Sequence, residues 1–194
     1  MRITIVGAAT SGLAAAHLAA RQGHDVFVTD ARPLSPTMAG ELTERGIRHE
    51  GGGHTNAALD ADLVIVSPGV PPTNVVRAQA AERGIELIGE LEYASRFLPN
   101  PIIGITGTNG KTTTTALTAH ILNASGRAAV TGGNIGTPLS TYVGQLDPSV
   151  VIVAECSSYQ LDTTTSFRPH VAMLLNITPD HITYHGSFQQ YVHA

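Results

Sequence analysis

The chain has 194 residues, of which 42% are apolar and 13% are charged, so it can build one large or two small ordinary cores. Its formal net charge of −4 and its lack of a basic run argue against nucleic acid as a main partner, because phosphate backbones are bound by clustered Lys and Arg. With no apolar stretch of membrane-span length, no basic-then-apolar signal and one cysteine, Cys156, it is expected to be a cytoplasmic, monomeric protein without membrane insertion.

The first residues read as the opening of a βαβ nucleotide-binding unit. We expect a strand over residues 2–6, a glycine-containing bend over 7–12, an alanine-rich helix over 13–20, and a second strand over 25–29. The dinucleotide fingerprint needs glycine at position 9, where the chain has Ala9, so the pattern argues against an NAD site. Thr10, Ser11 and the helix N-terminus behind them can still hold a diphosphate.

Polar residues follow the second and third expected strands. Asp30 stands where such folds place a ribose-binding carboxylate, and Arg32 comes just after it. A solvated turn residue is the alternative for Asp30. A short buried strand over 63–66 stops at Ser67-Pro68-Gly69, and parallel sheets present their ligand-binding loops at that end.

The remaining elements of the first half are helices, loops and one strand. They are expected as a helix reaching Arg45, a glycine loop at 51–53, a helix from Pro71-Pro72 to about Arg83, a strand over 85–88 and a helix over 91–97. The proline-rich stretch 98–101 reads as a linker. We therefore predict a Rossmann-like domain over 1–92 and a P-loop-type parallel α/β domain, in part, over 93–194.

Residues 102–114 have the layout of a phosphate-binding loop. An apolar strand runs into a glycine-rich bend, Lys111-Thr112, and a segment over 113–122 that can continue as a helix. Lys111 is the only lysine, and every other residue among the 11 Lys+Arg is arginine, which suggests a role that a planar guanidinium performs poorly. The strict pattern has glycine where this chain has Ile105. The alternative is a Thr- and Gly-rich surface loop with a chance lysine.

Two further strand ends of the second half place polar groups where they can reach a metal ion. A strand over 150–154 ends at Glu155, and a buried strand over 171–175 leads to a cluster that ends at His181. A capping acid and a structural histidine are the respective alternatives. Cys156 reads as a small buried residue at a strand end. A candidate strand over 128–131 precedes a glycine-rich turn. Residues 187–194 look like a helix that begins and is then cut off, so we expect a piece of a longer protein.

Four motifs, in this order and spacing, resemble those of the Mur ligases of peptidoglycan synthesis, over the whole chain. They are Gly107-Thr108-Asn109-Gly110-Lys111-Thr112, Gly133-Asn134-Ile135-Gly136, Glu155-Cys156-Ser157-Ser158-Tyr159-Gln160-Leu161 and Asn176-Ile177-Thr178-Pro179-Asp180-His181. Softer features, such as the Gly-Ala-Ala-Thr-Ser-Gly start at Gly7, favour the member that adds D-glutamate to UDP-N-acetylmuramoyl-L-alanine.

The resemblance implies an ATP- and Mg²⁺-dependent amide ligase that forms an acyl phosphate on the substrate carboxylate, which the incoming amine then displaces. It implies catalytic roles for Lys111, Asn134 and His181, and nucleotide contacts from Gly107, Thr108, Asn109, Gly110, Lys111, Thr112 and Thr113. Metal ligands would be Thr112, Glu155 and His181. The substrate would contact Thr10, Ser11, Asp30, Arg32, Ser67, Gly69, Asn134, Ser157 and Gln160.

Two departures from the family pattern limit what the resemblance implies. Thr183 stands where the family commonly has a second aspartate, and the chain reaches Ala194 without the metal-bridging carbamylated lysine or the third domain. We therefore expect no ligase turnover from these residues alone. The alternatives are another Mur ligase, a folylpolyglutamate synthase-like ligase, a dinucleotide-binding oxidoreductase domain fused to an NTPase, or a fragment that only binds nucleotide.

Overall fold

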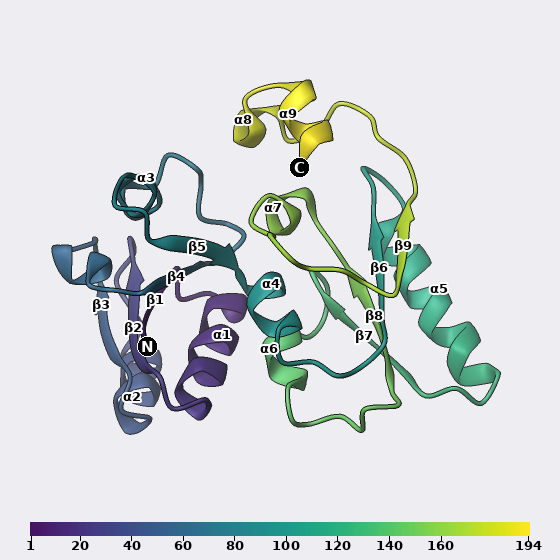
Figure 1. Ribbon diagram of the computed structural model, residues 1–194, viewed down its shortest axis with the longest axis horizontal. Helices are drawn as coiled ribbons and strands as arrows, with labels where there is room; N and C mark the ends of the chain where they lie inside the picture. The colour runs from purple at the N-terminus through teal and green to yellow at the C-terminus, as the bar shows by residue number, and fades with distance from the viewer.

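The computed structural model describes residues 1–194 and arranges them around two β-sheets (Figure 1). The first sheet has five strands in the order β3-β2-β1-β4-β5, and the second has four in the order β7-β8-β6-β9. All strand pairs are parallel. In both sheets the chain therefore crosses over through helices or loops, which confirms the predicted α/β class with a Rossmann-like first unit and a P-loop-type second unit.

The elements of the first unit follow one another with short connections. They are β1 (Arg2–Val6), α1 (Thr10–Arg21), β2 (Asp25–Asp30), α2 (Pro36–Glu44), β3 (Arg48–Gly51), the 3₁₀ turn η1 (Asn56–Leu59), β4 (Leu63–Val66), α3 (Val75–Glu82) and β5 (Glu86–Gly89).

The second unit follows through a helix that leads directly out of the first sheet. Its elements are α4 (Glu90–Ser95), β6 (Ile102–Thr106), α5 (Lys111–Ala124), β7 (Ala129–Gly133), α6 (Leu139–Tyr142), β8 (Val151–Glu155), α7 (Ser158–Leu161), β9 (Val171–Leu174), α8 (Ile182–His185) and α9 (Phe188–His193).

Most predicted strands and helices are confirmed, and the exceptions have local causes. The helix expected to start at Pro71-Pro72 begins only at Val75, because the Asn74 side chain accepts from the N–H of Val76 and caps the helix there. Strand β3 was not predicted, since its residues Arg48 to Gly51 are polar and it is an edge strand.

The prediction that the strand after residue 170 is buried is wrong. Strand β9 lies at the edge of the second sheet, paired only with β6, and all its residues are exposed, including Leu174 at 62%. An apolar sequence run predicts burial only where another layer covers the strand, and no element of this chain covers β9.

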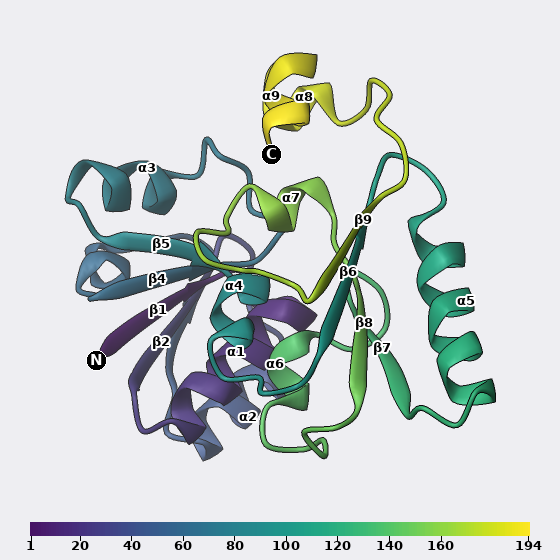
Figure 2. The same ribbon diagram turned by 45° about the vertical axis from the view of Figure 1, so that its right-hand side comes forward.

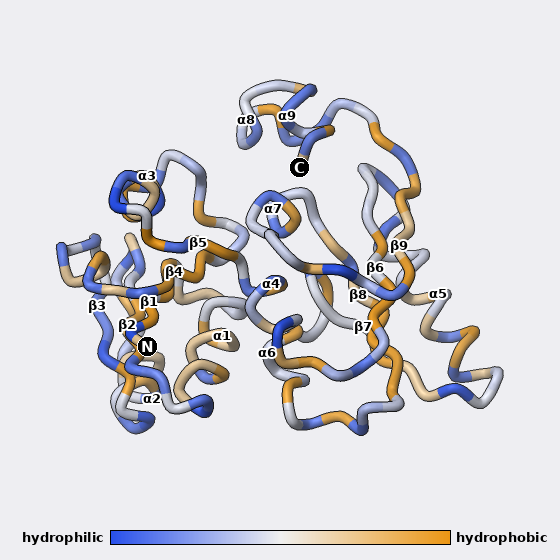
Figure 3. Tube along the Cα trace, in the orientation of Figure 1, coloured by the Kyte–Doolittle hydropathy of each residue, from blue (hydrophilic) through white to orange (hydrophobic).

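The two sheets share one hydrophobic core between them. Helices α1, α4 and α6 lie between the sheets, and α5 covers the far side of the second sheet (Figures 1 and 2). This core joins α1 and the strands of the first sheet to Ile102 and Ile152 of the second, with Leu91 of α4 and Leu139 of α6 between them. The central strands are accordingly apolar along much of their length (Figure 3).

The predicted domain boundary between residues 92 and 93 falls inside helix α4. This helix packs against both α1 and α6, and its Glu90 carboxyl accepts from the N–H of Ser140 at 2.6 Å. Burial raises the pKa of Glu90, whose other carboxyl oxygen has no partner. The chain thus passes between its two sheets through a buried helix, and the division into the two predicted domains stays a prediction.

Cys156 follows β8 and is buried, as expected for a structural residue. Burial raises the pKa of its thiol to about 12. None of the helices combines the length and the apolar character that crossing a membrane requires. The expected cytoplasmic location stays a prediction.

Glu92 fastens α4 to the loop that follows α7. Its Oε2 accepts from the N–H groups of Thr165, Ser166 and Phe167 at 2.8–3.1 Å, and its Oε1 accepts from the Ser166 hydroxyl and from Arg96. Burial alone would raise the pKa of this carboxyl, but these donors more than offset burial and lower it to about 2.

We predict that Glu92→Gln lowers the free energy of unfolding by about 2–3 kcal/mol at pH 7, the order of magnitude of that pKa shift. Because the folded-state pKa is lowered, the difference between wild type and variant should shrink as the pH falls from about 4.5 towards about 2. Urea denaturation across this pH range measures it. Glu86→Gln is the matched control, since exposed Glu86 also binds Arg96 and should cost under about 0.5 kcal/mol. Equal losses for both variants would contradict the prediction.

Candidate functional site

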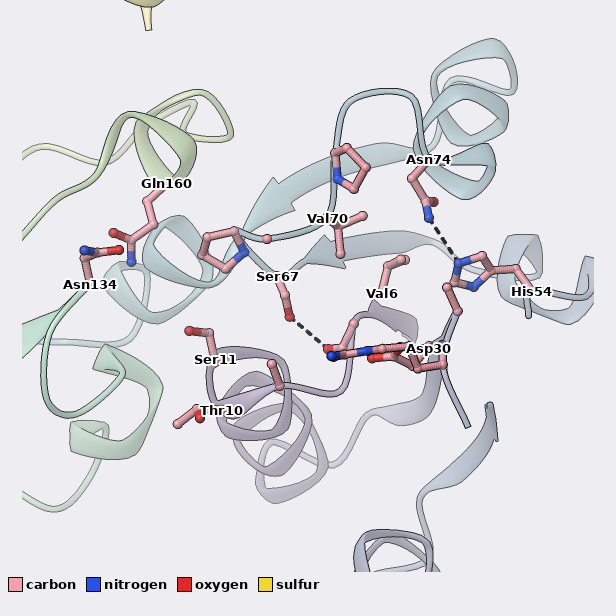
Figure 4. Close-up of a pocket in the computed structure, with 17 residues that line it drawn as sticks. Val6, Thr10, Ser11, Asp30, His54, Ser67, Val70, Asn74, Asn134 and Gln160 are labelled. Atoms are coloured by element: carbon pink, nitrogen blue, oxygen red, sulfur yellow. Dashed lines mark hydrogen bonds and ion pairs between the residues drawn. The ribbon is translucent and has the colours of Figure 1, made fainter. Parts of the chain in front are cut away.

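A cavity of about 610 Å³ opens at the carboxyl ends of β1, β2 and β4 and reaches across to the second unit (Figure 4). It lies at the point where the order of the first sheet reverses, which is the ligand-binding position of open parallel sheets. Its lining residues are Val6, Gly7, Ala9, Thr10, Ser11, Asp30, Ala31, Arg32, His54, Ser67, Pro68, Gly69, Val70, Pro71, Asn74, Asn134 and Gln160.

The first turn of α1 borders this cavity. Ala9 is the N-cap and makes no side-chain cap hydrogen bond, and Thr10 and Ser11 form the start of the helix. The N–H groups of a first helical turn have no acceptor within the helix, so they and the two hydroxyls offer hydrogen-bond donors to an anion. The structure thus brings Thr10 and Ser11 to the place that the sequence predicted for a diphosphate.

The turn before this helix is held by Gly7 and Ser67. Gly7 has a φ of 95°, and the Ser67 hydroxyl donates to its carbonyl oxygen at 2.8 Å. A Cβ on Gly12 would come within 1.8 Å of the same carbonyl oxygen, so only glycine fits there. Ser67 lines the cavity, but its hydroxyl proton is committed to the turn. Gly69 lines the same wall.

Asp30 lies at the end of β2 with both carboxyl oxygens bound to backbone. Oδ2 accepts from the N–H of Ala8 and Oδ1 from the N–H of Arg32, each at 2.8 Å. Burial alone would raise the pKa of Asp30, but these N–H groups outweigh burial and lower it. Asp30 therefore holds the β1–α1 loop in place and presents a carboxylate beside the largely exposed Arg32 guanidinium.

The phosphate-type loop between β6 and α5 has the backbone that its sequence predicted. Gly107 and Gly110 have φ angles of 142° and 87°, and Ile105 is a fully buried strand residue before the bend. No acceptor in the chain receives the N–H groups of residues 110–113. The Lys111 ammonium lies across the loop and donates to the carbonyl oxygens of Gly107 and Thr108, at 2.6 and 3.0 Å. The loop therefore offers backbone donors without a partner and one cation next to them.

Asn176, which the sequence analysis quoted only within a motif, supports this loop. It accepts from the N–H groups of Thr108 and Asn109 and donates from its amide to the Asn109 carbonyl oxygen. The Thr108 hydroxyl accepts from the N–H of Thr178 and contacts Tyr191, so it faces the following loop rather than the open side. The strand-end position of Asn176 beyond β9 could have indicated this role.

Glu155 connects the phosphate-type loop to the cavity. Its buried carboxylate accepts from the Thr112 hydroxyl at 2.8 Å through Oε2 and from the Asn134 amide at 2.7 Å through Oε1. Asn134 in turn lines the cavity, opposite His54 and Asn74 (Figure 4). Thr112 and Glu155 thus pair two oxygens of the kind that Mg²⁺ prefers.

Two other predicted substrate residues bind each other. The Ser157 side chain accepts from the N–H of Gln160, and the Gln160 side chain accepts from the N–H of Ser157, which makes a capping box at the start of α7. Gln160 also reaches the cavity wall, whereas Ser157 does not line it.

His181 lies apart from the pair of Thr112 and Glu155 in its contacts. Its backbone has a φ of 52°, its Nδ1 lies 3.5 Å from Asp180, and its ring packs 4.7 Å from the ring of Tyr159. No group of three or more His, Cys, Asp or Glu side chains is close enough together to hold a metal ion. The contacts of His181 thus link it to the aromatic residues Tyr159 of α7 and Tyr191 of α9, and its role as a metal ligand stays a prediction.

The sequence analysis missed His54 and Asn74, which form the wall of the cavity opposite Asn134. His54 follows the unpredicted strand β3, and Asn74 lies in the stretch predicted as helix. The glycine run at 51–53 marked a loop at a strand end, and this was the one signal that could have indicated His54.

Comparison of the sequence with known families gives two matches, one in each half of the chain. A family described as "Mur ligase MurD-like, N-terminal domain" matches residues 1–89, and "Mur ligase middle domain" matches residues 105–194. Two curated relatives are the UDP-N-acetylmuramoylalanine–D-glutamate ligases of Salinibacter ruber and Desulfosudis oleivorans. They are 48% and 44% identical to this chain, over 100% of its length. The chain spans 43% of the length of each relative.

Solved structures show the same fold. A murein peptide ligase from Psychrobacter arcticus matches 100% of the chain with a TM-score of 0.57 and 26% identity, and the match covers 46% of that protein. A UDP-N-acetylmuramate:L-alanyl-gamma-D-glutamyl-meso-diaminopimelate ligase from Neisseria matches 99% of the chain and 66% of its own, with a TM-score of 0.60 and 24% identity.

We predict that Asn134→Asp lowers the free energy of unfolding by about 2 kcal/mol at pH 7.5, because it sets a second carboxylate against Glu155. The loss should shrink at pH 5, where one proton shared by the two carboxylates relieves the repulsion. Urea denaturation at both pH values measures it. The control is Asn56→Asp at an exposed position that begins η1, where little change is expected. A loss that does not depend on pH would contradict the prediction.

Proposed function

The chain belongs to the Mur ligase family, and we propose that it forms the nucleotide-binding part of a ligase that adds D-glutamate to UDP-N-acetylmuramoyl-L-alanine. In this reaction the substrate carboxylate attacks the γ-phosphate of ATP, ADP leaves, and the amine of D-glutamate displaces phosphate from the acyl phosphate. The similarity to the D-glutamate ligases over the whole chain supports this choice of substrates. We propose that the protein works as a cytoplasmic monomer in peptidoglycan precursor synthesis.

The observation that supports this function best is the hydrogen-bonded connection from Thr112 through Glu155 to Asn134. Thr112 follows the phosphate-type loop and Asn134 lines the cavity, so the connection would hold a triphosphate site and a substrate site at a fixed separation. A ligase that moves a phosphoryl group onto a bound substrate needs this arrangement, because most of its rate acceleration comes from positioning and electrostatics.

We propose that the cavity holds the uridine diphosphate part of the substrate. The N-terminus of α1 with Thr10 and Ser11 would bind the diphosphate, together with the wall of Ser67 and Gly69. Asp30 and Arg32 would contact the uridine, and Asn134 and Gln160 would face the muramoyl end, next to Ser157. The free donors lie at the helix end, and the Asp30 carboxylate borders the same loop through the N–H of Ala8.

The donors of the phosphate-type loop suit the phosphate groups of ATP with bound Mg²⁺. We propose that the free N–H groups of residues 110–113 and the Lys111 ammonium bind the phosphates, with Gly107, Thr108 and Asn109 shaping the loop. The hydroxyl of Thr112 and the carboxylate of Glu155 would bind one magnesium ion, and His181 would bind a second. When bound, magnesium neutralises charge that develops on the transferred phosphoryl group.

We predict that UDP-N-acetylmuramoyl-L-alanine raises the melting temperature of the 1–194 chain by about 5–10 °C at one hundred times its Kd. NADH and a folate should leave it unchanged, and differential scanning fluorimetry compares the three ligands. Arg32→Ala should weaken the shift by loss of a cavity cation, whereas Arg127→Ala, which replaces an exposed arginine of the second unit, should not. Stabilisation by NADH or by the folate alone would overturn the proposal.

In a ligase that contains this chain together with the further length of its relatives, we predict that Lys111→Ala lowers D-glutamate-dependent phosphate release by at least about 10³-fold. Lys111→Arg should not rescue it, because a guanidinium cannot replace a compact ammonium at this loop. Binding of UDP-N-acetylmuramoyl-L-alanine should be unchanged, since Lys111 does not line the cavity. The control is His120→Gln on the exposed side of α5, which should retain activity. Normal turnover in the Lys111 variants would contradict the assignment.

A further inference from the structure

A chain of hydrogen bonds closes the cavity wall opposite Asn134. His54, from the loop after β3, contacts Asn74, the residue that precedes α3, and their side chains meet at the right of Figure 4. Both residues line the cavity, and neither takes part in the connection from Thr112 to Asn134.

The orientation of the Asn74 amide is set by helix α3. Its Oδ1 accepts from the N–H groups of Val76 and Arg77, at 2.9 and 3.4 Å. Its Nδ2 must therefore be the group that lies 3.1 Å from His54 Nε2. Because an amide NH₂ can only donate, His54 Nε2 must accept, and so it is unprotonated.

The other side of the ring is fixed as well. His54 Nδ1 lies 2.7 Å from the Thr29 hydroxyl, which donates to Glu50 Oε1 at 2.8 Å. Burial alone would raise the pKa of Glu50, but donors from Thr55 and Thr29 outweigh burial and lower it, so this carboxylate only accepts. The Thr29 hydroxyl thus gives its proton to Glu50 and accepts one from Nδ1. Only the neutral ring with its proton on Nδ1 satisfies every contact.

The hydrogen bond between His54 and Asn74 connects two loops that the sheet does not connect. In the order β3-β2-β1-β4-β5, strands β3 and β4 are separated by β2 and β1, so no backbone ladder joins the loops that follow them. The loop after β3 presents His54 to the cavity, and the loop after β4 presents Ser67, Gly69 and Asn74. The contact between His54 and Asn74 therefore fixes the separation of the loops after β3 and β4 across the cavity mouth.

Charged groups from each neighbouring element have other partners. Asp30 of β2 is bound by backbone N–H groups and lies beside Arg32, and Arg77 of α3 donates to Val70 and to Tyr184. Arg77 also lies 3.5 Å from Asp162. Glu50 of β3 is the charged group that acts on His54, and it does so through Thr29.

We propose that His54 is a positioning residue for the nucleoside diphosphate site: in its neutral form it holds Asn74 and fixes the cavity width, and protonation of Nε2 releases this wall. The inference rests on the proposed function of the cavity. A protonated Nε2 would direct an N–H at the Asn74 NH₂ group, and two donors cannot pair.

The test is the Kd of UDP-N-acetylmuramoyl-L-alanine for the chain, measured by calorimetry between pH 8 and pH 5.5. Its diphosphate is esterified at both ends, so the ligand diphosphate does not titrate in this range. The wild-type Kd should rise as the pH falls, by up to about tenfold between the two ends of the range, because the released wall lowers the binding-competent fraction. His54→Gln should bind more weakly at pH 8 and lose most of the pH dependence, whereas His120→Gln should follow wild type.

Asn74→Asp gives the sharper result. Aspartate still caps α3, but its second oxygen accepts from a protonated Nε2, so the variant should favour the charged ring. The ratio of its Kd to that of wild type should exceed 1 at pH 8 and fall below 1 at pH 5.5. If this ratio stays constant while both proteins bind, the role of His54 is overturned. If wild type does not bind at any pH, the proposed function fails instead.

The protonation state of His54 can also be measured without any ligand. The ¹⁵N shifts of the His54 ring at pH 8 should show the proton on Nδ1 in wild type, with thermal melting to confirm that each variant is folded. A proton on Nε2 would overturn the inference even if every affinity changed as expected.

Discussion

The buried carboxylate of Glu155 is the contact on which the arrangement of the site depends. It stands at the end of the central strand β8, and each of its oxygens accepts from a different segment, Thr112 of the phosphate-type loop and Asn134 of the cavity wall. A buried carboxylate must find donors or remain unfavourable, so these contacts specify where both segments lie. The separation of the two candidate binding sites is therefore set by one side chain.

The shared core extends this constraint to the whole molecule. Helices α1, α4 and α6 pack against one another between the two sheets, and one apolar core includes residues of all three helices and of both sheets. Glu92 adds a polar attachment, because it binds the backbone after α7 to the helix that links the sheets. The carboxyl ends of β1, β4 and β8 thus open towards a common region, and a cavity begun by the first unit is completed by Asn134 and Gln160 of the second.

Several polar residues of the site hold the backbone in place. Asp30, Ser67 and Ser157 each have their hydrogen bonds committed to nearby backbone or to a cap. The backbone donors without a partner are those at the N-terminus of α1 and the amides of residues 110–113 at the start of α5, and the ammonium of Lys111 lies beside the latter on two carbonyl oxygens. Rigid loops that present backbone donors need no reorganisation when an anion arrives, which favours binding of phosphate groups.

The sequence by itself determined the local structure: the apolar runs of the central strands, the glycines and lysine of the phosphate-type loop, and the helix that follows it. These features depend on neighbouring residues, and so a linear pattern can specify them. Only the tertiary structure decided that β9 is exposed and that His54 meets Asn74 across the cavity. Those outcomes depend on strand order and on which layer covers which face, because they join residues that are far apart in the chain.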